Sequence, residues 1–302
     1  MEGALTVADE RTREVVQLLI SRGGKRLRPA LLLLSARYGN GNEEQLLKAA
    51  AGLELIHVAS LYHDDVMDRA MTRRAAATAN GSWGNSVATM GGVFLFAKAI
   101  SLISSLGSSA NQITGTATCR LCAGQLREAE NAFNVDITVD EHLEILNLKT
   151  ATLFELPCQL GMLLSPCNPE QATALTCYGN RLGLAFQLVD DALDWEGDKE
   201  SLGKTPLSDI REGVYSLPVI HVLESSGSQS QRLRSLLIQR RLSEADVLEI
   251  KRIVHDSGGV SVALEKAREL VMDAKKQVSI LPAGFPLTSL RALADFCLTR
   301  TN

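Results

Sequence analysis

The sequence predicts an all-α protein, and three observations support that prediction. Long stretches are rich in Leu and Ala while aromatic residues make up only 4% of the chain, a composition that favours helix over strand. Apolar residues recur at helical spacing along most of the chain. We find no pair of strand-like segments joined by a tight turn.

The expected helices follow one another with short breaks. A first helix around Val15 ends at Gly23 and Gly24, and Pro29 fits the first turn of the second. Residues 196–213, rich in Gly, Asp and Lys, are interpreted as a functional loop. Further helices are expected over residues 43–69, 91–105, 113–131, 139–164 and 169–195, and again from about 215 and from 243.

Length and composition favour one globular domain. The 302 residues are 45% hydrophobic and no long linker divides them, so residues 1–302 are interpreted as a single domain. The net charge of −4, without a basic stripe, disfavours nucleic-acid binding. Residues 75–97 are poor in charge but broken by small polar residues, which predicts a loop and a buried helix rather than a membrane span. Six cysteines, mostly in apolar helical sequence, and no secretory signal favour a cytoplasmic protein.

One acidic pattern, DDxxD, occurs twice in apolar helical sequence. The first cluster is Asp64-Asp65-Val66-Met67-Asp68, and the second cluster is Asp190-Asp191-Ala192-Leu193-Asp194. The outer aspartates of each cluster are four residues apart and share a helix face. Three neighbouring carboxylates repel one another, and a hard cation such as Mg²⁺, which also binds substrate phosphates, relieves that repulsion. The alternative, a solvated acidic helix face, is disfavoured because the pattern is repeated.

Cations accompany the acids at several places. Arg69 adjoins the first cluster, whereas no cation adjoins the second. Acids and cations together suggest two diphosphate sites, one bound through metal and the other by direct Arg and Lys contacts. The basic sequences are Gly23-Gly24-Lys25-Arg26-Leu27-Arg28-Pro29, Arg73-Arg74, Lys149-Thr150 and Lys204.

These motifs resemble those of the trans-isoprenyl diphosphate synthases, also called the polyprenyl synthetase family, from residue 23 to about 220. The resemblance is carried by Gly24-Lys25-Arg26-Leu27-Arg28-Pro29, Glu54-x-x-His57, His63-Asp64-Asp65-x-x-Asp68, Arg73-Arg74, Lys149-Thr150-Ala151, Gly183-x-Ala185-Phe186-Gln187-x-x-Asp190-Asp191-x-x-Asp194 and Gly203-Lys204. It implies an orthogonal bundle of long helices around a deep central pocket, usually in a homodimer. The implied reaction is ionisation of an allylic diphosphate and its coupling to isopentenyl diphosphate, with possible transient membrane contact when the product leaves.

The resemblance also implies roles for individual residues. The implied magnesium ligands, for two or three ions, are Asp64, Asp68 and Asp190, with Asp65, Asp191 and Asp194 as close or water-mediated support. The implied contacts of the allylic diphosphate are Arg73, Lys149, Thr150, Gln187 and Lys204, and those of isopentenyl diphosphate are Lys25, Arg28, His57 and Arg74. The expected catalytic set is Asp64, Asp65, Asp68, Lys149, Asp190 and Lys204. For His57, a hydrogen-bonded core histidine is the alternative.

The chain departs from the family pattern at three places. Residues 75–78 read Ala-Ala-Ala-Thr instead of Gly-x-Pro-Thr, Val93 replaces Asp after Gly92, and Val214 replaces a lysine. Slower turnover, a changed substrate preference or a weakly active subunit of a heteromeric synthase are the expected consequences. A class I terpene cyclase is the other alternative, although such an enzyme needs no isopentenyl site.

Product length is predicted from the helix before the first cluster. Ala59 and Ser60 lie about one helical turn before Asp64, at the depth where a growing chain is expected to pass. Both side chains are small, so geranylgeranyl diphosphate or a longer product is expected.

Overall fold

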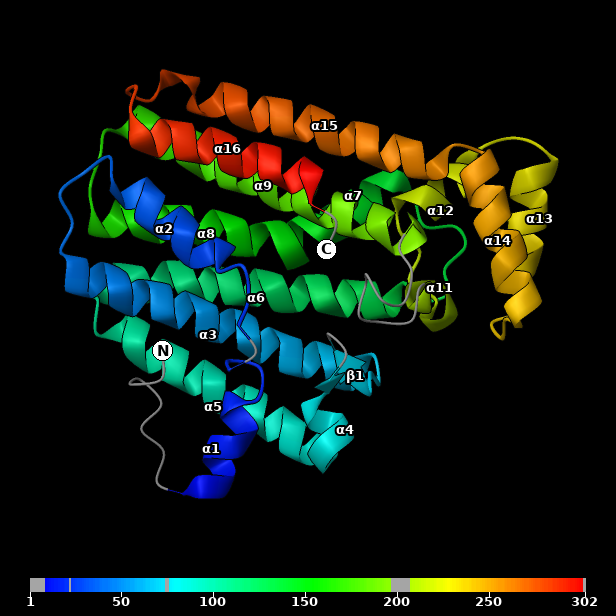
Figure 1. Ribbon diagram of the computed structural model, residues 1–302, viewed down its shortest axis with the longest axis horizontal. Coiled ribbons are helices and arrows are strands. Elements are labelled where there is room, and N and C mark those ends of the chain that lie inside the picture. Colours follow the sequence, from blue (N-terminus) through cyan, green and yellow to red (C-terminus); the bar gives the residue numbers. More distant parts are fainter. Residues whose placement is uncertain (1–8, 22, 74–75, 197–206, 301–302) are drawn as a thin grey trace. The chain divides into compact units, whose positions relative to one another are not determined.

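The structure, a computed structural model, describes residues 9–21, 23–73, 76–196 and 207–300. These residues are almost entirely helical, as the sequence predicts (Figure 1). The described part of the chain also contains an unpredicted hairpin, in which β1 (Thr72–Arg73) pairs antiparallel with β2 (Ala76–Ala77). The chain divides into two compact units. Unit 1 consists of residues 1–117, 153–176 and 280–287, and unit 2 of residues 118–152, 177–279 and 288–302.

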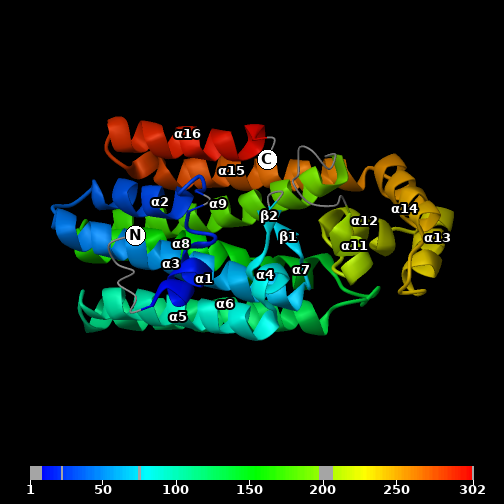
Figure 2. The same cartoon turned by 60° about the horizontal axis from the view of Figure 1, so that its bottom comes forward.

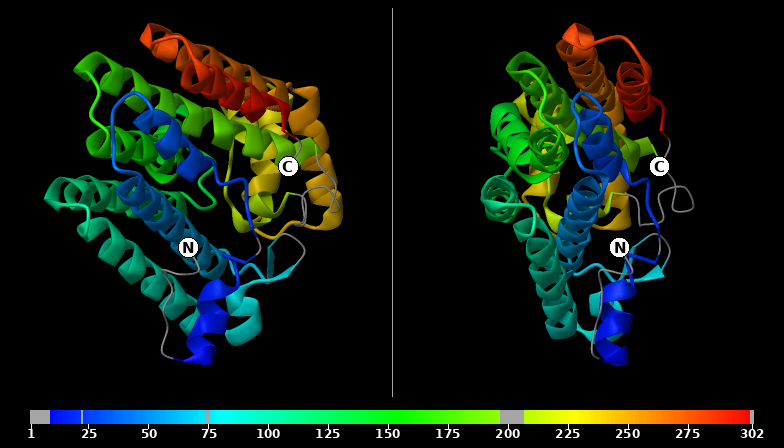
Figure 3. Two further views of the ribbon diagram at one scale, coloured as in Figure 1. Left: turned by 60° about the vertical axis from the view of Figure 1, so that its left-hand side comes forward. Right: turned by 90° about the vertical axis from the view of Figure 1, so that its left-hand side faces the viewer.

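Unit 1 is built around one long helix, α3 (Glu43–Met67), which contacts α2 (Leu27–Ala36), α4 (Ala79–Trp83) and α5 (Asn85–Ser104). Figure 3 shows α2 beside α3, and Figure 2 shows the β1–β2 hairpin close to α4. The unit also includes α1 (Glu10–Gln17) and parts of α6 (Ser108–Glu130), α8 (Thr152–Leu164) and α9 (Pro169–Glu196). Its core packs small and branched residues closely, which holds α3 in place. The main core cluster is Leu32, Ala36, Leu46, Ala49, Ala50, Leu53, Ile103, Ala110, Ala117, Leu156 and Leu160.

A close approach of α5 fixes the end of α3. A Cβ atom on Gly92 would lie 2.4 Å from His63 Nε2, so a side chain at this position of α5 would collide with His63. The His63 ring stacks on Phe96 at 5.7 Å between centroids. The neighbouring Tyr62 is fully buried, and its hydroxyl donates a hydrogen bond to the carbonyl of Val15. The residues that lead into the first cluster are therefore rigidly packed.

Helix α5 corrects one expectation. Among the described residues, it is the one helix long and apolar enough to cross a membrane, with a mean hydropathy of 1.7. Only 33% of that window is buried, and Met90 and Val93 are 63% and 46% exposed. The predicted buried helix is present, but one side of it is exposed.

Unit 2 is organised around α12 (Leu217–Glu224), most of whose apolar residues are buried. Helix α12 contacts α7 (Val139–Leu146), α13 (Ser228–Leu237), α14 (Glu244–Asp256) and α15 (Gly259–Gln277). In Figure 1, α13 and α14 lie side by side, as their contacts also show. The unit also contains α11 (Ser208–Glu212), the 3₁₀ turn η3 (Val278–Ile280) in part, and most of α16 (Phe285–Thr299).

The helix predicted over residues 139–164 is interrupted in the middle. Helix α7 gives way to a π-helical turn, η2 (Asn147–Ala151), before α8 begins. Lys149 and Thr150 lie in this turn, and π turns inside α-helices are frequent at functional sites. A Cβ atom on Gly124 would lie 2.5 Å from the backbone nitrogen of Lys149, so α6 meets the turn in near backbone contact.

Candidate active site

The first cluster lies at the C-terminal end of α3, as predicted. Asp68 is the C-cap residue, and its backbone N–H donates to the carbonyl of Asp64 at 2.8 Å. The C-terminal end of a helix carries a partial negative charge, which adds to the mutual repulsion of the carboxylates. Asp65 is 1% exposed, whereas Asp64 and Asp68 are partly exposed. The two outer aspartates, which share one helix face, are therefore more accessible than the middle one.

Arg73 is a cationic partner of the first cluster, although Arg69 is the cation that adjoins the cluster in sequence. Arg73 Nε donates to Asp65 Oδ1 at 2.7 Å, while Arg69 is exposed and has a left-handed backbone with φ of 52°. The β1–β2 hairpin carries Arg73 back to the end of α3. Asn80 holds this loop, because its Nδ2 donates to the carbonyls of Asp65 and Ala70 at 3.2 and 2.9 Å. Arg74, a predicted ligand of isopentenyl diphosphate, lies outside the described residues.

The basic segment before α2 contains a structural ion pair. Arg26, left-handed with φ of 50°, pairs through Nη1 with Glu54, which is 5% exposed, and its Nη2 donates to the carbonyl of Ile20 at 3.2 Å. This pair ties the start of α2 to α3 one turn before His57. Glu54, a motif residue without an assigned role, is thus a structural partner.

The predicted isopentenyl-binding residues of unit 1 lie around this ion pair. Lys25 is exposed just before α2, and Arg28 lies in the first turn of α2, its guanidinium 5.0 Å from the Phe154 ring centroid. His57 is partly buried, and its carbonyl accepts a hydrogen bond from Ser60 Oγ at 2.8 Å. Of the two predicted chain-length residues, Ser60 is partly exposed while Ala59 is fully buried.

The second cluster lies in the last turns of α9, again as predicted. Asp191, 8% exposed, accepts a hydrogen bond on Oδ1 from Gln187 Nε2 at 2.9 Å. Gln187 Oε1 in turn accepts from Thr150 Oγ1 at 2.9 Å. The structure therefore joins two predicted diphosphate ligands, Thr150 and Gln187, to the second cluster.

Two partners of the second cluster were not found from the sequence. Arg300 Nη1 lies 2.6 Å from Asp190 Oδ1, so this cluster also has a cation. His142 Nε2, in a side chain that is 6% exposed, lies 3.6 Å from Asp191 Oδ2. Neither residue is near the cluster in sequence, which is why no motif revealed them.

Lys149 has an acidic partner that the sequence analysis also missed. Its ammonium group contacts Glu128 Oε2, and the two side chains are 23% and 18% exposed. Gln125 Nε2 lies 3.4 Å from the same oxygen. The charge of this predicted diphosphate ligand is therefore engaged by a carboxylate on α6. Lys204, the other predicted catalytic lysine, lies outside the described residues.

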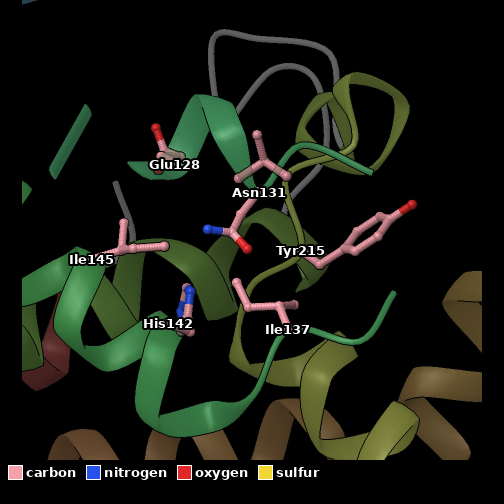
Figure 4. A pocket seen from close by; sticks show the side chains of 7 residues that line it. Glu128, Asn131, Ile137, His142, Ile145 and Tyr215 are labelled. Carbon is pink, nitrogen blue, oxygen red and sulfur yellow. The ribbon is translucent and has the colours of Figure 1, made fainter. Parts of the chain in front are cut away.

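A small pocket in unit 2 separates Glu128 from His142 (Figure 4). It holds about 10 Å³ of free space, which is at the lower limit for accommodating one water molecule. Val214, where the family pattern has a lysine, lines it and places no charge there. Burial raises the pKa of Tyr215 to about 12, so this hydroxyl stays protonated at neutral pH. The pocket is lined by Glu128, Asn131, Ile137, His142, Ile145, Val214 and Tyr215.

The carboxylates suit a magnesium ion that is completed by substrate and water. Within the described ranges, no three His, Cys, Asp or Glu side chains form a ligand set by themselves. Mg²⁺ usually takes only one or two carboxylates and fills its other positions with water and phosphate oxygens. The partly exposed carboxylates of Asp64, Asp68 and Asp190 fit that need.

Comparison with known proteins agrees with the motifs. The polyprenyl synthetase family pattern matches residues 9–254. The nonaprenyl diphosphate synthase of Mycobacterium tuberculosis is 36% identical over 302 residues, covering 99% of this chain and 90% of that protein. The octaprenyl diphosphate synthase of Escherichia coli is 35% identical over 287 residues, covering 93% and 88%.

Solved structures show the same fold. A polyprenyl synthase from Caulobacter crescentus, complexed with calcium and isoprenyl diphosphate, has a TM-score of 0.94 and 32% identity, covering 99% of this chain and 92% of that one. This chain therefore belongs to the polyprenyl synthetase family and has the all-α isoprenoid synthase fold. It is a prenyltransferase that elongates prenyl diphosphate chains.

Proposed function

We propose that this enzyme adds isopentenyl diphosphate to an allylic diphosphate until the product reaches geranylgeranyl length or beyond, with Mg²⁺ as its cofactor. One observation carries the proposal. The same DDxxD sequence stands at the C-terminal ends of two long helices, α3 and α9, and an arginine pairs with one aspartate of each. We assign both clusters to the same allylic diphosphate, within a single functional domain of residues 1–302.

The proposed roles follow from the chemistry of each side chain. Asp64, Asp68 and Asp190 would hold two or three Mg²⁺ ions, with the other three aspartates as support. The chemistry that bound Mg²⁺ supplies is stabilisation of negative charge on the departing diphosphate. The oxygens of that diphosphate would be bound by Arg73, Lys149, Thr150 and Gln187, and by Lys204 on the sequence pattern alone.

Isopentenyl diphosphate would be bound through direct cationic contacts. Lys25, Arg28 and His57, with Arg74 on the sequence pattern alone, would hold its diphosphate and aim its double bond at the allylic carbon. Loss of the first diphosphate leaves an allylic cation, which this double bond attacks. A proton then leaves the new chain for the released diphosphate, and apolar walls keep water from the cation.

The assignment of a long product has two supports. Relatives that match nearly the whole chain are named for octaprenyl and nonaprenyl products. In addition, Ser60, one turn before the first cluster, is small and partly exposed. A short-chain product limited by a bulky residue at this depth is therefore disfavoured.

One assay tests the proposal. Purified protein is incubated with Mg²⁺, labelled isopentenyl diphosphate and geranyl, farnesyl or geranylgeranyl diphosphate, and the dephosphorylated products are separated by chromatography. Longer prenyl alcohols are expected, and Asp64→Asn is the matched inactive control. Hydrocarbon products would indicate a terpene cyclase, and wild type that stops at farnesyl would contradict the assigned length.

A heteromeric enzyme is the second candidate because of one relative. The heptaprenyl diphosphate synthase component 2 of Geobacillus stearothermophilus is 37% identical over 276 residues, covering 91% of this chain and 84% of that protein. Turnover by this chain alone, purified to homogeneity, would exclude the need for another component. Inactivity of a folded chain that still binds an allylic diphosphate would favour it.

We further propose a cytoplasmic homodimer that contacts membranes only when its product leaves, and that binds no nucleic acid. The exposed apolar residues of α5, Met90 and Val93, suit a surface covered by a second copy. Light scattering should give twice the chain mass, and Val93→Glu should reduce it to a monomer. A monomeric wild type at micromolar concentration would contradict the dimer.

A further inference from the structure

Arg300 is held against the second cluster by several interactions within unit 2. It follows α16, which packs beside α9 (Figure 1), where the Tyr178 hydroxyl donates to the carbonyl of Leu290 at 2.6 Å. Arg300 Nη1 lies 2.6 Å from Asp190 Oδ1, and Nη2 donates to the carbonyl of Phe186. Its guanidinium also lies 3.7 Å from the Phe186 ring centroid. Since Phe186 and Asp190 are one turn apart, the arginine covers one stripe of α9.

The two partners of this ion pair differ in their exposure. The Arg300 side chain is 2% exposed and that of Asp190 is 40% exposed. A buried guanidinium needs its acceptors, because an uncompensated buried charge is strongly unfavourable. A partly exposed carboxylate is also accessible to water. Asp190 is therefore the partner that solvent and a ligand can reach, while Arg300 is buried.

We propose that Arg300 is a positioning residue that sets the metal affinity of the second cluster. Resting on the proposed role of Asp190 as a magnesium ligand, this inference makes Arg300 the resident counter-charge of that carboxylate. The guanidinium keeps the cluster compact without metal, and its positive charge opposes any divalent cation that binds Asp190. Metal binding at this cluster is thereby weak until a diphosphate supplies further negative charge.

The inference predicts opposite effects of one substitution on two properties. Arg300→Gln removes the counter-charge, so the metal-free protein should unfold at a lower temperature because three aspartates then repel one another. The same variant should bind Mn²⁺, used as the probe for Mg²⁺, about tenfold more tightly. A purely structural role for Arg300 predicts the loss of stability alone.

The experiment is Mn²⁺ titration followed by electron paramagnetic resonance, with calorimetric unfolding scans of the same samples. Arg300→Lys keeps the charge and should restore wild-type Mn²⁺ affinity. Arg181→Gln is the matched control, since Arg181 also lies on α9 and pairs with Asp273 at 2.8 Å, away from the cluster. This control should leave Mn²⁺ affinity unchanged.

Unchanged or weaker Mn²⁺ binding in folded Arg300→Gln would overturn the inference. If Arg300→Gln does not fold, nitrogen NMR of wild-type arginine side chains replaces it, with Arg300→Lys used for assignment. Adding Mg²⁺ and inorganic diphosphate should then shift the Arg300 resonance, and an unmoved resonance would overturn the inference. Asp190→Asn distinguishes failure of the proposed metal site from failure of the inference about Arg300. If this variant retains wild-type Mn²⁺ affinity, Asp190 is not a metal ligand, and the inference, which rests on that role, also fails.

Discussion

The two DDxxD clusters are identical in pattern but are neutralised differently. In the first cluster, Arg73 pairs with the middle aspartate, Asp65, at 2.7 Å. In the second, Arg300 pairs with the leading aspartate, Asp190, at 2.6 Å. The counter-charge therefore sits on a proposed supporting residue in one cluster and on a proposed metal ligand in the other. The two arginine pairs therefore differ in the position of the motif at which they act, although the acidic motif is the same.

The middle aspartates show the same contrast. Asp65 is 1% exposed and has a cationic partner, so its charge is compensated. Asp191 is 8% exposed; its Oδ1 accepts a hydrogen bond from the neutral amide of Gln187, and its Oδ2 lies 3.6 Å from His142 Nε2. In the second cluster, Arg300 compensates charge at the leading aspartate, while the amide of Gln187 orients the middle one.

The largest expected effect tests whether both clusters serve one reaction. Asp64→Asn and Asp190→Asn should each lower kcat about 10³-fold, because each removes a ligand worth several kcal/mol of charge stabilisation. Their stabilities should differ, since only Asp190→Asn removes the partner of a buried arginine. Steady-state kinetics and calorimetric Tm measure the two effects. Equal Tm values in the two variants would contradict the proposed difference between the two clusters.

A smaller effect is expected at the middle positions and should be seen in stability. Asp65→Asn leaves the Arg73 guanidinium without its carboxylate and should cost about 3 kcal/mol of unfolding free energy. Asp191→Asn keeps a hydrogen bond to Gln187 and should cost about 1 kcal/mol. Urea unfolding without metal measures both. A larger cost for Asp191→Asn than for Asp65→Asn would show that Asp191 depends on more than the Gln187 hydrogen bond, with His142 Nε2, 3.6 Å from its Oδ2, as the other contact.

A third prediction concerns the lysine next to the second cluster. Glu128 engages Lys149 and is negatively charged, so it opposes an incoming diphosphate. Glu128→Gln keeps a hydrogen-bond acceptor for Lys149 and should lower KM for the allylic diphosphate about fivefold, with little change in kcat. The control is Arg127→Gln, on the same helix as Glu128, which removes an exposed ion pair between Arg127 and Glu144 of α7. A raised KM in Glu128→Gln would mean that the carboxylate orients the lysine productively.

Sequence reasoning located what is encoded locally. Both aspartate clusters and the helices that carry them follow from spacing and motif, and the grouping of Thr150 with Gln187 was implied by the family resemblance. Arg73, eight residues from Asp65, was expected to bind substrate, but its pairing with Asp65 depends on a hairpin too short to leave an alternating pattern.

The missed features are those without a local signature. Arg300 is 114 residues from Phe186, so no periodicity connects them. The π turn at residues 147–151 was hidden because a helical apolar pattern continues on both sides of it. Arg26 and Arg28 look alike in the sequence, and only the tertiary partner Glu54 separates a structural cation from a proposed ligand.

The smallest expected effect on rate, and the clearest effect on product length, comes from substitution of the residue one helical turn before a cluster. Four residues before the leading aspartate stands Ser60 on α3 but Phe186 on α9. The Phe186 ring is covered by Arg300, so that turn of α9 is filled by the chain itself. Ser60 is small and partly exposed, which supports the proposal that a growing prenyl chain passes along α3.

Ser60→Phe should therefore shorten the product by at least one isoprene unit while kcat for the first addition changes less than about threefold, since the chemistry is one turn away. Ala59→Phe is a poorer test because Ala59 is fully buried and a ring there overpacks the core. Phe186→Leu is the matched variant on α9 and should leave product length unchanged. Chromatography of dephosphorylated products compares all three with wild type. If Phe186→Leu lengthens the product or Ser60→Phe leaves it unchanged, the growing chain does not follow α3, and product length is set elsewhere in the molecule.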